Sequence, residues 1–448
     1  MNISFDAFQK YLNSSIFKTP ENFDSDYIYN RPHGIRNTNI SDEDFFRFSI
    51  LSDNLLSNDS LVSNRLLMSI YEQNMLLLNE EKLSQNMQNQ FFDFYDVQHI
   101  AMGRFLKPKL EHKCFSFLDD FIKISNGNWD SELLTSYFEE QIEQHESVPS
   151  NLCQYLEKEK NPDQAKFVLI QMAPDFLTEA SAMCKALPGS FGTVQSEFMK
   201  IFIDEYGYGV HSQKHSSLFE KCLESVNISS RMHKYYHFYL ASSLMLVNYF
   251  HYVCENKRNW FRYLGALYYT EATIPHFNKQ MSKVLKHIFG SGSVDTKYFD
   301  EHVHIDVFHK NMVLNNLILP SVETYGTSII PDIIKGFEEF KFLQDVSDKD
   351  VLEQLKFSIN SYPKNISEVC LRENPDVFKE KKMEISFPHL HQNDELFYVK
   401  CGNIKFFNGV NECVLKENDV LFIPKNRLHG TIAMSDDCEY FVSKEDSI

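Results

Sequence analysis

Two patterns of hydrophobic and polar positions divide the chain. Up to about residue 362, apolar residues recur every three or four positions, as in "SNRLLMSIYEQNMLLL" (63–78), which is typical of amphipathic helices. From residue 384 onward, short runs such as "MEISF", "ELFYVKC" and "DVLFI" alternate apolar with polar residues, which predicts short antiparallel strands. We therefore expect a multidomain, mainly α-helical protein with a small C-terminal β-barrel.

Breaks in this pattern predict three domains. Polar residues interrupt the helical pattern at "SNGNWDSE" (125–132), and the texture changes after "YPKNISEVC" (362–370). We expect a helical N-terminal domain at 1–130, a helical bundle at 131–365 and a β-domain at 366–448. An uncharged run at 235–254 is long enough to span a bilayer, but it contains Asn248 and two histidines. We expect it to be a buried helix of the bundle rather than a membrane span.

Composition narrows the classes of function. The 448 residues include 44 Lys and Arg against 62 Asp and Glu, and the net charge of −18 disfavours nucleic-acid binding while allowing a small cationic substrate. The nine cysteines are scattered and include no CxxC, as expected in a reducing compartment. The first residues lack the order of a signal peptide. We expect a cytoplasmic protein without nucleic-acid or membrane partners.

Two histidines share one face of a predicted strand in "FPHLHQNDELFYVKCG" (387–402). Side chains at i and i+2 of a strand point the same way, so His389 and His391 project together. His429, after the Pro-containing turn of "NDVLFIPKNRLHG" (418–430), could join them from a neighbouring strand. Three neutral imidazoles suit Fe(II) and other first-row metals and leave coordination positions open. The alternative is that the histidines lie on a solvated strand face.

These residues resemble the two motifs of the cupin family. The first motif, H-x-H-x3-E-x6-G, is matched in full by His389, His391, Glu395 and Gly402. The second is matched in part: Pro424 and His429 are present, Asn418 and Asn426 stand in the glycine positions, and Ala433 replaces the last Asn. Because Asn tolerates a left-handed backbone, we expect the turns to be kept. The resemblance implies that the three histidines hold iron, with Glu395 a further candidate; a cupin that has lost its metal is the alternative.

A second set of metal-binding side chains occurs in "DEHVHIDVFHKN" (300–311). His302, Asp306 and His309 fall within about 60° on one helix face, whereas His304 lies opposite. A carboxylate between two histidines is costly in an apolar core unless the groups hold a cation. Other helical segments offer carboxylates and an imidazole that could face inward, namely Glu179, Glu205, His215 and Glu271, with Glu197, His211 and His276 as rivals. This arrangement is typical of a dinuclear carboxylate site in a bundle, although a solvated helix face is the alternative.

The helical set resembles the haem-oxygenase-like diiron oxidases and oxygenases. Their hallmark is a glutamate, a histidine after a Gly-containing break, a lone glutamate and H-x3-D-x2-H, and "DEYGYG" (204–209) supplies the break. The resemblance implies that one iron ion is bound by Glu205, His215 and His302, and the other by Glu271, Asp306 and His309. Glu179 would be the additional ligand of the N-oxygenating branch.

A haem-oxygenase-like diiron domain followed by a cupin is similar to the N-nitrosourea-forming enzymes of streptozotocin-type biosynthesis. That resemblance implies a non-haem iron monooxygenase that N-hydroxylates the guanidine of N-omega-methyl-L-arginine or L-arginine at the diiron site. The product would be oxidatively rearranged to an N-nitrosourea at the cupin iron. The cofactors would be two Fe(II) ions in the helical domain and one in the cupin, with O2 as co-substrate and an external electron donor. The resemblance also implies a homodimer formed through the N-terminal domain. The main alternative is a diiron N-oxygenase that stops at an N-hydroxylated product and uses its cupin for structure or product binding; a ligand-binding sensor and an iron-storage bundle fit the motifs less well.

Overall fold

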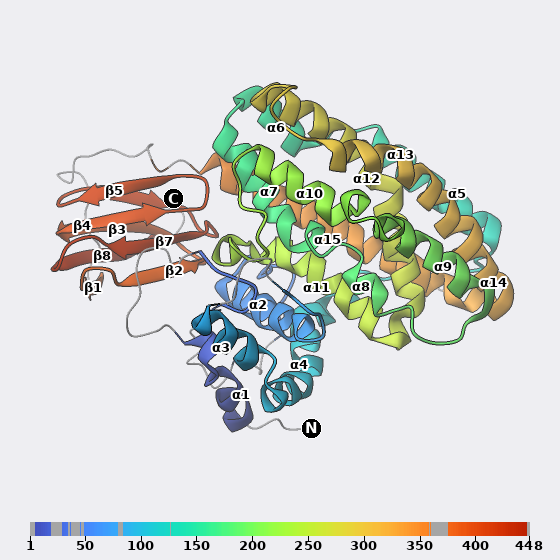
Figure 1. The fold of residues 1–448 in the computed structure, drawn as a ribbon, viewed down its shortest axis with the longest axis horizontal. Coiled ribbons are helices and arrows are strands. Elements are labelled where there is room, and N and C mark those ends of the chain that lie inside the picture. The colour runs from blue at the N-terminus through green and yellow to red at the C-terminus, as the bar shows by residue number, and fades with distance from the viewer. Residues whose placement is uncertain are drawn as a thin grey trace. The chain divides into compact units, whose positions relative to one another are not determined.

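The computed structural model describes residues 5–18, 29–34, 36, 45, 49–78, 84–125, 127–357, 359 and 375–445 (Figure 1). Their contacts cluster into two compact units. One unit combines residues 1–114, 231–244 and 350–448, and the other combines residues 115–230 and 245–349. The division of the chain at 130/131 and 365/366 stays a prediction, and its second boundary lies outside the described residues.

The N-terminal part of the first unit is helical, as the sequence pattern predicts. Its helices are α1 (Phe5–Leu12), α2 (Asn58–Glu72), α3 (Gln85–Phe94) and α4 (Val97–Phe121), the last of which continues into the second unit. A buried ion pair of 2.5 Å joins Arg36 to Glu72 at the end of α2. Arg65, also buried on α2, donates hydrogen bonds to the carbonyl oxygens of His237 and Pro388. Side-chain contacts from α2 therefore tie together all three segments of this unit.

The C-terminal strands of the first unit form two four-stranded antiparallel sheets (Figure 1). The strands are β1 (Asp376–Glu380), β2 (Ile385–His389), β3 (Asp394–Cys401), β4 (Asn403–Phe407), β5 (Glu412–Lys416), β6 (Val420–Ile423), β7 (His429–Ala433) and β8 (Cys438–Glu445). The sheet orders are β1-β8-β3-β6 and β2-β7-β4-β5. Phe397 and Val399 of one sheet pack with Ile404 and Phe406 of the other in a shared core. The predicted C-terminal β-domain is confirmed, but its described strands form a sandwich of two sheets rather than one closed barrel.

Two asparagines keep the turns that a cupin usually makes with glycine. Asn418 and Asn426 have φ angles of 72° and 59°, in the left-handed region that Asn tolerates. Gly402 has a φ of 84°, and a Cβ there would lie 2.5 Å from the Ser435 hydroxyl. The expectation that the turns survive the Gly-to-Asn replacements is therefore confirmed.

The second unit is a bundle of helices (Figure 1). Its helices are α5 (Ser131–Glu146), α6 (Asn151–Glu159), α7 (Pro162–Phe176), α8 (Ser181–Cys184), α9 (Gly192–Glu205), α10 (His215–Ser225), α11 (Ala241–Glu255), α12 (Trp260–Phe289), α13 (Lys297–Met312), α14 (Leu319–Tyr325) and α15 (Ile330–Lys356). The first residues of α11 and the last residues of α15 belong to the first unit. Local sequence signals determine where α7 begins. Asn161 caps the helix and Pro162 occupies its first turn, where a missing N–H costs nothing.

Two glycines allow α12 and α15 to approach closely. A Cβ at Gly265 would overlap the carbonyl oxygen of Ile333, and a Cβ at Gly336 would overlap that of Arg262. Only glycine fits where backbones meet in this way. Because Glu271 follows Gly265 by less than two turns of α12, this crossing helps to fix the helix that carries one predicted ligand.

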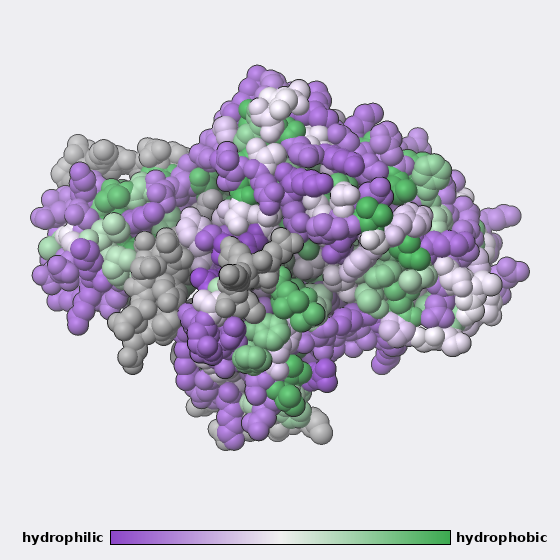
Figure 2. Space-filling view, viewed as in Figure 1, coloured by the Kyte–Doolittle hydropathy of each residue, from purple (hydrophilic) through white to green (hydrophobic). Residues whose placement is uncertain are grey.

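The uncharged run at 235–254 supplies most of α11, as predicted. Side chains on several faces of this helix are buried, including those of Leu244, Met245, Tyr249 and Val253. Among the described helices, none is both long enough and apolar enough to cross a bilayer. The molecular face shown in Figure 2 carries mainly hydrophilic residues, with smaller hydrophobic areas between them.

Candidate functional site

Seven side chains predicted as iron ligands lie in the helical unit. α9 ends at Glu205, α10 begins at His215, α12 carries Glu271, α13 carries His302, Asp306 and His309, and Glu179 lies between α7 and α8. Six of the seven are buried and Glu179 is partly buried. The stripe on α13 therefore faces the interior, and the alternative of a solvated helix face is wrong.

A glycine-containing break brings Glu205 and His215 together. Gly207 and Gly209 have φ angles of 57° and 80°, and a Cβ at Gly207 would lie 2.5 Å from backbone atoms of Gln213 and Lys214. This tight path of the chain requires glycine. It places Oε2 of Glu205 2.6 Å from Nδ1 of His215.

The ligand atoms form two groups that share one carboxylate. In the first group, atoms of Glu179, Glu205, His215 and His302 all lie within 4.8 Å of one another; in the second, those of Glu205, Glu271 and His309 do. Glu205 therefore occupies the position of a carboxylate that could bridge two metal ions. Asp306 lies outside both groups, but its Oδ1 is 3.8 Å from Nδ1 of His309, so it borders the second group.

Several of these buried atoms form no hydrogen bond of good geometry with the described residues, although oppositely charged groups lie close to some of them. They are Oε2 of Glu179, Oε2 of Glu205, Nδ1 of His215, Oδ1 of Asp306 and Nδ1 of His309. Each unpaired buried polar atom costs about 1–3 kcal/mol. Bound cations would offset the cost of gathering so many polar atoms in a buried cluster, and nitrogen and carboxylate ligands suit iron. The residues present therefore fit a pair of iron ions.

The ring of His302 is oriented by the backbone. Its Nδ1 donates a 2.8 Å hydrogen bond to the carbonyl of Tyr298, and its Nε2 lies 3.1 Å from Oε1 of Glu179. With the ring proton on Nδ1, a neutral imidazole turns the Nε2 lone pair towards a carboxylate oxygen. That contact is unfavourable unless a metal ion or a second proton lies between the two atoms.

His309 is held from behind by Asp204, a residue that the sequence analysis missed. Nε2 of His309 lies 3.1 Å from Oδ2 of Asp204. Its Nδ1 consequently faces Oε2 of Glu271 at 3.3 Å and Oε1 of Glu205 at 3.4 Å. A carboxylate behind a ligating imidazole fixes the tautomer and raises the basicity of the ring. Asp204 could not be identified from local spacing, because its contact depends on how α9 and α13 pack.

The charges in this cluster shift the pKa values of its members. Burial alone would raise the pKa of Glu205, but His215, His302 and His309 lower it to about 2. Burial opposes protonation of His309, but Glu271 and Glu205 raise its pKa to about 10. Burial raises the pKa of Asp306 well above its usual value. Metal binding at this cluster therefore competes with protons for His309 and Asp306.

A cavity of about 90 Å³ adjoins the helical cluster. Its lining includes Glu179, Glu205, Glu271, His302 and Asp306, together with apolar and aromatic side chains. A mostly apolar space with a few convergent polar groups is typical of a small-molecule site. The cluster therefore opens onto a space for a small reacting group.

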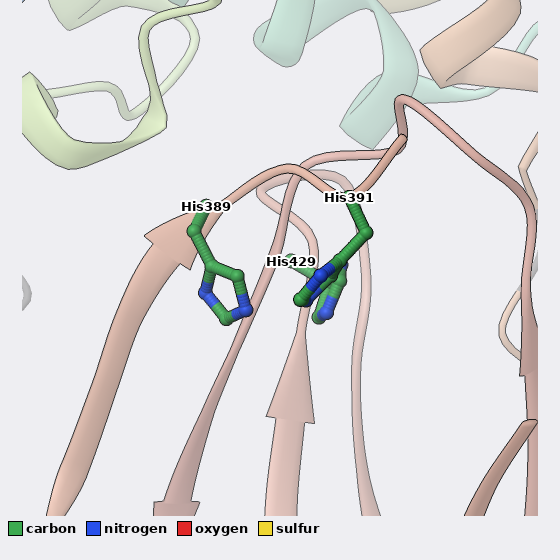
Figure 3. A group of neighbouring side chains, drawn as sticks. All are labelled: His389, His391 and His429. Carbon is green, nitrogen blue, oxygen red and sulfur yellow. The ribbon is translucent and has the colours of Figure 1, made fainter. Parts of the chain in front are cut away.

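Three histidines converge at the end of the β-sandwich (Figure 3). His389 ends β2, His429 begins the neighbouring strand β7, and His391 lies in the loop after β2. One nitrogen of each ring lies within 4.8 Å of the others, and the ring centroids are 4.7 to 5.3 Å apart. The predicted convergence from two neighbouring strands is thus present, although His391 comes from the loop.

Each of these rings has its Nδ1 next to an oxygen. Nδ1 of His389 donates to the carbonyl of Phe387 at 2.8 Å, and Nδ1 of His429 donates to that of Arg427 at 2.9 Å. Nδ1 of His391 lies 2.9 Å from the buried carboxylate of Glu395. Because these oxygens accept the Nδ1 protons, the Nε2 lone pairs are left for a metal ion. Glu395 lies outside the three-histidine group, in a position that orients His391.

Burial keeps two of the cupin rings in the metal-binding form. Burial, with His391 nearby, lowers the pKa of His389 to about 4. Burial together with His389 and His391 lowers the pKa of His429 well below its usual value. Neutral imidazole is the form that binds metal, so little proton competition opposes binding here at neutral pH. The three histidines therefore fit a single iron ion.

Gln354, near the end of α15, holds the loop that leads to His429. Its Nε2 donates to the carbonyl of Asn426 at 2.7 Å, and its Oε1 accepts from the N–H of Leu428 at 3.1 Å. The two hydrogen bonds fix the backbone directly before the ligand. The sequence analysis missed this role, because the partners are more than 70 residues apart.

The rival ligands lie in other environments. Glu197 pairs with Lys200 and Asn316, His211 contacts Ser217, and His276 contacts the carbonyl of Val148. None of the three belongs to the groups of candidate ligands found among the described residues. His304 is exposed on the opposite face of α13, as predicted.

Comparisons with known proteins match both parts of the chain. Residues 166–343 match a family described as an iron-containing redox enzyme, and residues 378–443 match the cupin domain family. The chain is 37% identical over 402 residues to the nitrosourea synthase of Streptomyces achromogenes subsp. streptozoticus, an alignment that covers 87% of this chain and 84% of that protein. The candidate ligands of the helical centre lie within the first family match, and the three histidines lie within the second.

Proposed function

The chain belongs to the nitrosourea synthase family of iron-containing redox enzymes, and from this premise we propose a two-step reaction on one chain. The helical centre N-hydroxylates the guanidine of N-omega-methyl-L-arginine or L-arginine. The cupin centre then oxidatively rearranges the hydroxylated product to an N-nitrosourea, with one O2 as the four-electron oxidant: one oxygen atom enters the product, and the other leaves as water with the two hydrogens that the product loses. The observation that carries the proposal is the sharing of Glu205 by two groups of ligand atoms, since carboxylates from several helices that converge in this way are typical of dinuclear iron centres in helical bundles.

In the helical centre, we assign Glu205 as the shared ligand between two iron sites. Glu179, His215 and His302 complete one site, and Glu271 and His309 complete the other, with Asp306 next to it. Two Fe(II) ions bound there would supply the electrons and open coordination positions that O2 activation needs. The protein orients the substrate group in the adjoining cavity and keeps bulk water away.

The balance of the first step requires a reductant. Each hydroxylation converts an N–H bond into N–OH, consumes one O2 and releases one water, so it takes up two electrons and two protons. The family activity implies an external electron donor for this supply. Asp204 has a separate role, because it holds the ring of His309 from outside the ligand group.

In the cupin centre, His389, His391 and His429 would hold one iron ion through Nε2. Three neutral ligands leave positions at which a hydroxylated product could bind. Backbone carbonyls and Glu395 fix the three rings before metal binds. The alternative is that the cupin only binds product or supports the fold.

We also propose a homodimer formed through residues 1–130. Light scattering after size-exclusion chromatography would give twice the chain mass of 52.6 kDa if this is correct. Removal of residues 1–130 is not a clean test, because part of this segment belongs to a unit that includes the cupin. A monomer at micromolar concentration would contradict the proposal.

The two-step proposal is tested by loading the full chain with Fe(II) without O2 and then adding O2, a reductant and the arginine substrate. We expect about three iron ions per chain and an N-nitrosourea by mass spectrometry. His389→Ala should keep O2 consumption and accumulate the hydroxylated intermediate. His302→Ala should form neither product, whereas His304→Ala, on the exposed face of the same helix, should behave like the wild type.

Three outcomes would change the assignment. An unchanged final product from His389→Ala would exclude a chemical role of the cupin and favour the alternative. A hydroxylated compound as the only product of the wild type would do the same. Normal hydroxylation by His302→Ala would contradict the role of the helical centre itself.

A further inference from the structure

The cavity beside the helical cluster is lined by acidic and apolar side chains, by two histidines and by hydroxyl groups, and by no Lys or Arg among the described residues. Its volume of about 90 Å³ is smaller than the roughly 150 Å³ of an engineered cavity that holds benzene. A planar group somewhat smaller than benzene, such as a guanidinium, would therefore fit. The several carboxylates in its lining favour a cationic group over a carboxylate as the group that enters.

One carboxylate in this cavity is not a candidate metal ligand. Asp175 lies in the last turn of α7 and lines the cavity, one helical turn before Glu179. It belongs to neither group of ligand atoms. The part of the chain that the structure describes provides no hydrogen bond or ion pair to its side chain, which is partly buried and lines the cavity. A partly buried carboxylate without such a partner is available to a cationic group that enters the cavity.

The surroundings of Asp175 disfavour its negative charge unless a positive group lies beside it. Burial, with a smaller contribution from Glu179, raises its pKa to about 7. An ionised Asp175 is therefore costly in the empty cavity, and a cationic ligand would remove this cost. A guanidinium offers two parallel N–H donors to one carboxylate and keeps its third nitrogen free.

We infer that Asp175 forms the subsite that binds the cationic guanidinium or ammonium group of the substrate beside the helical centre. The inference rests on the proposed N-hydroxylation of a guanidine and names the residue that selects it. Asp175 would hold two of the guanidinium nitrogens while the third lies towards the ligand cluster that lines the same cavity. The subsite discriminates by charge, so it rejects a neutral group of the same shape.

The test compares L-arginine with L-citrulline, in which a neutral urea replaces the guanidinium. Calorimetry on the Fe(II)-loaded full chain, without O2, measures binding of both compounds to the wild type and to Asp175→Asn. We expect the wild type to prefer arginine by at least about 10-fold. Asp175→Asn should weaken arginine binding about 10- to 100-fold and leave citrulline binding within about twofold. In turnover, KM for the arginine substrate should rise more than kcat falls.

Two further variants control for the fold and for charge. Asp175→Glu keeps the charge and should retain the preference for arginine. Asp163→Asn removes an exposed carboxylate from the first turn of the same helix and should behave like the wild type. All variants should bind as much iron as the wild type, because Asp175 is outside the ligand groups.

The outcomes separate this inference from the proposed function. An unchanged arginine preference in Asp175→Asn, no preference in the wild type, or loss of iron from Asp175→Asn would overturn the inference. Selective binding of arginine that depends on Asp175, but without any N-hydroxylated product, would support the subsite and refute the proposed chemistry. An N-hydroxylated product with no effect of Asp175→Asn on arginine binding would support the proposed chemistry and refute the subsite.

Discussion

Gln354 gives a sharp test of how the cupin centre is preorganised. Replacing it by methionine keeps the volume and the helix propensity but removes both hydrogen bonds to the loop before His429, together with one to Asp350 of the same helix. We expect the variant to fold and the loop backbone at Asn426 and Leu428 to lose its fixed position. Binding of iron through His429 must then order this loop, so the cost of ordering moves from folding to metal binding.

The size of the effect follows from the two lost contacts. A buried hydrogen bond contributes about 1 kcal/mol net, so their loss is about 2 kcal/mol. Because 1.4 kcal/mol corresponds to a factor of ten, iron affinity at the cupin should fall about 30-fold. The affinity of the helical centre should not change, since its candidate ligands come from other residues.

Competition with a chelator measures this affinity, and the electron paramagnetic resonance signal of a nitric oxide adduct reports the mononuclear ferrous site separately. Gln344→Met is the matched control, because it removes a partly exposed glutamine from the same helix and one hydrogen bond to Asp348. Wild-type affinity in Gln354→Met, in a folded protein, would refute the reasoning. An equal loss in Gln344→Met would show that the effect comes from α15 as a whole.

Three further perturbations probe other features. Glu205→Gln weakens a ligand shared by two groups, so metal analysis should find about one iron ion per chain instead of about three; loss of a single ion would contradict the shared position. Burial raises the pKa of Asp350 from 3.8 to about 6, so its contribution to stability is present below pH 3.8 and lost as pH rises through 6. Between pH 3.5 and pH 7, the unfolding free energy of the wild type, measured in urea, should therefore fall by about 3 kcal/mol more than that of Asp350→Asn. The same dependence of unfolding free energy on pH in both proteins would refute this. Gly265→Ala forces a Cβ into the carbonyl of Ile333 and should lower the unfolding free energy by about 1–3 kcal/mol, whereas Gly292→Ala, in open space, should cost far less.

Much of the fold could be predicted because it is encoded by short-range patterns. The change from helical to strand periodicity located the C-terminal β-domain, and the i, i+4, i+7 spacing placed His302, Asp306 and His309 on one buried face. The left-handed backbone at Asn418 and Asn426 was also predictable, since it depends on the residue type at a turn. In contrast, strand pairing is a long-range property, and the expectation of one closed barrel missed the separation into two sheets.

The parts of the candidate site that escaped prediction all depend on tertiary contacts. Asp204 touches His309 across 105 positions of sequence. Asp175 precedes Glu179 by one turn, but only the cavity shows that its carboxylate faces the same space. Gln354 acts through backbone groups, which have no side-chain signature at all. Spacing within one helix or strand can reveal ligands, whereas the groups that orient ligands and substrate become visible only in three dimensions.

The oxygen acceptors behind the three cupin imidazoles have a consequence for metal selection. Rings that are already aimed at one point offer the same three nitrogens to any divalent ion that arrives. Nitrogen ligands follow the Irving–Williams series, in which copper, nickel and zinc bind more tightly than ferrous iron. Three preoriented histidines therefore cannot by themselves select Fe(II) over metals that bind nitrogen ligands more tightly. The metal that the site holds is therefore set by which ion is freely supplied while the chain folds. Recombinant protein grown in zinc-rich medium should carry zinc at the three histidines, and it should lack the proposed cupin reaction until the zinc is removed and replaced by iron.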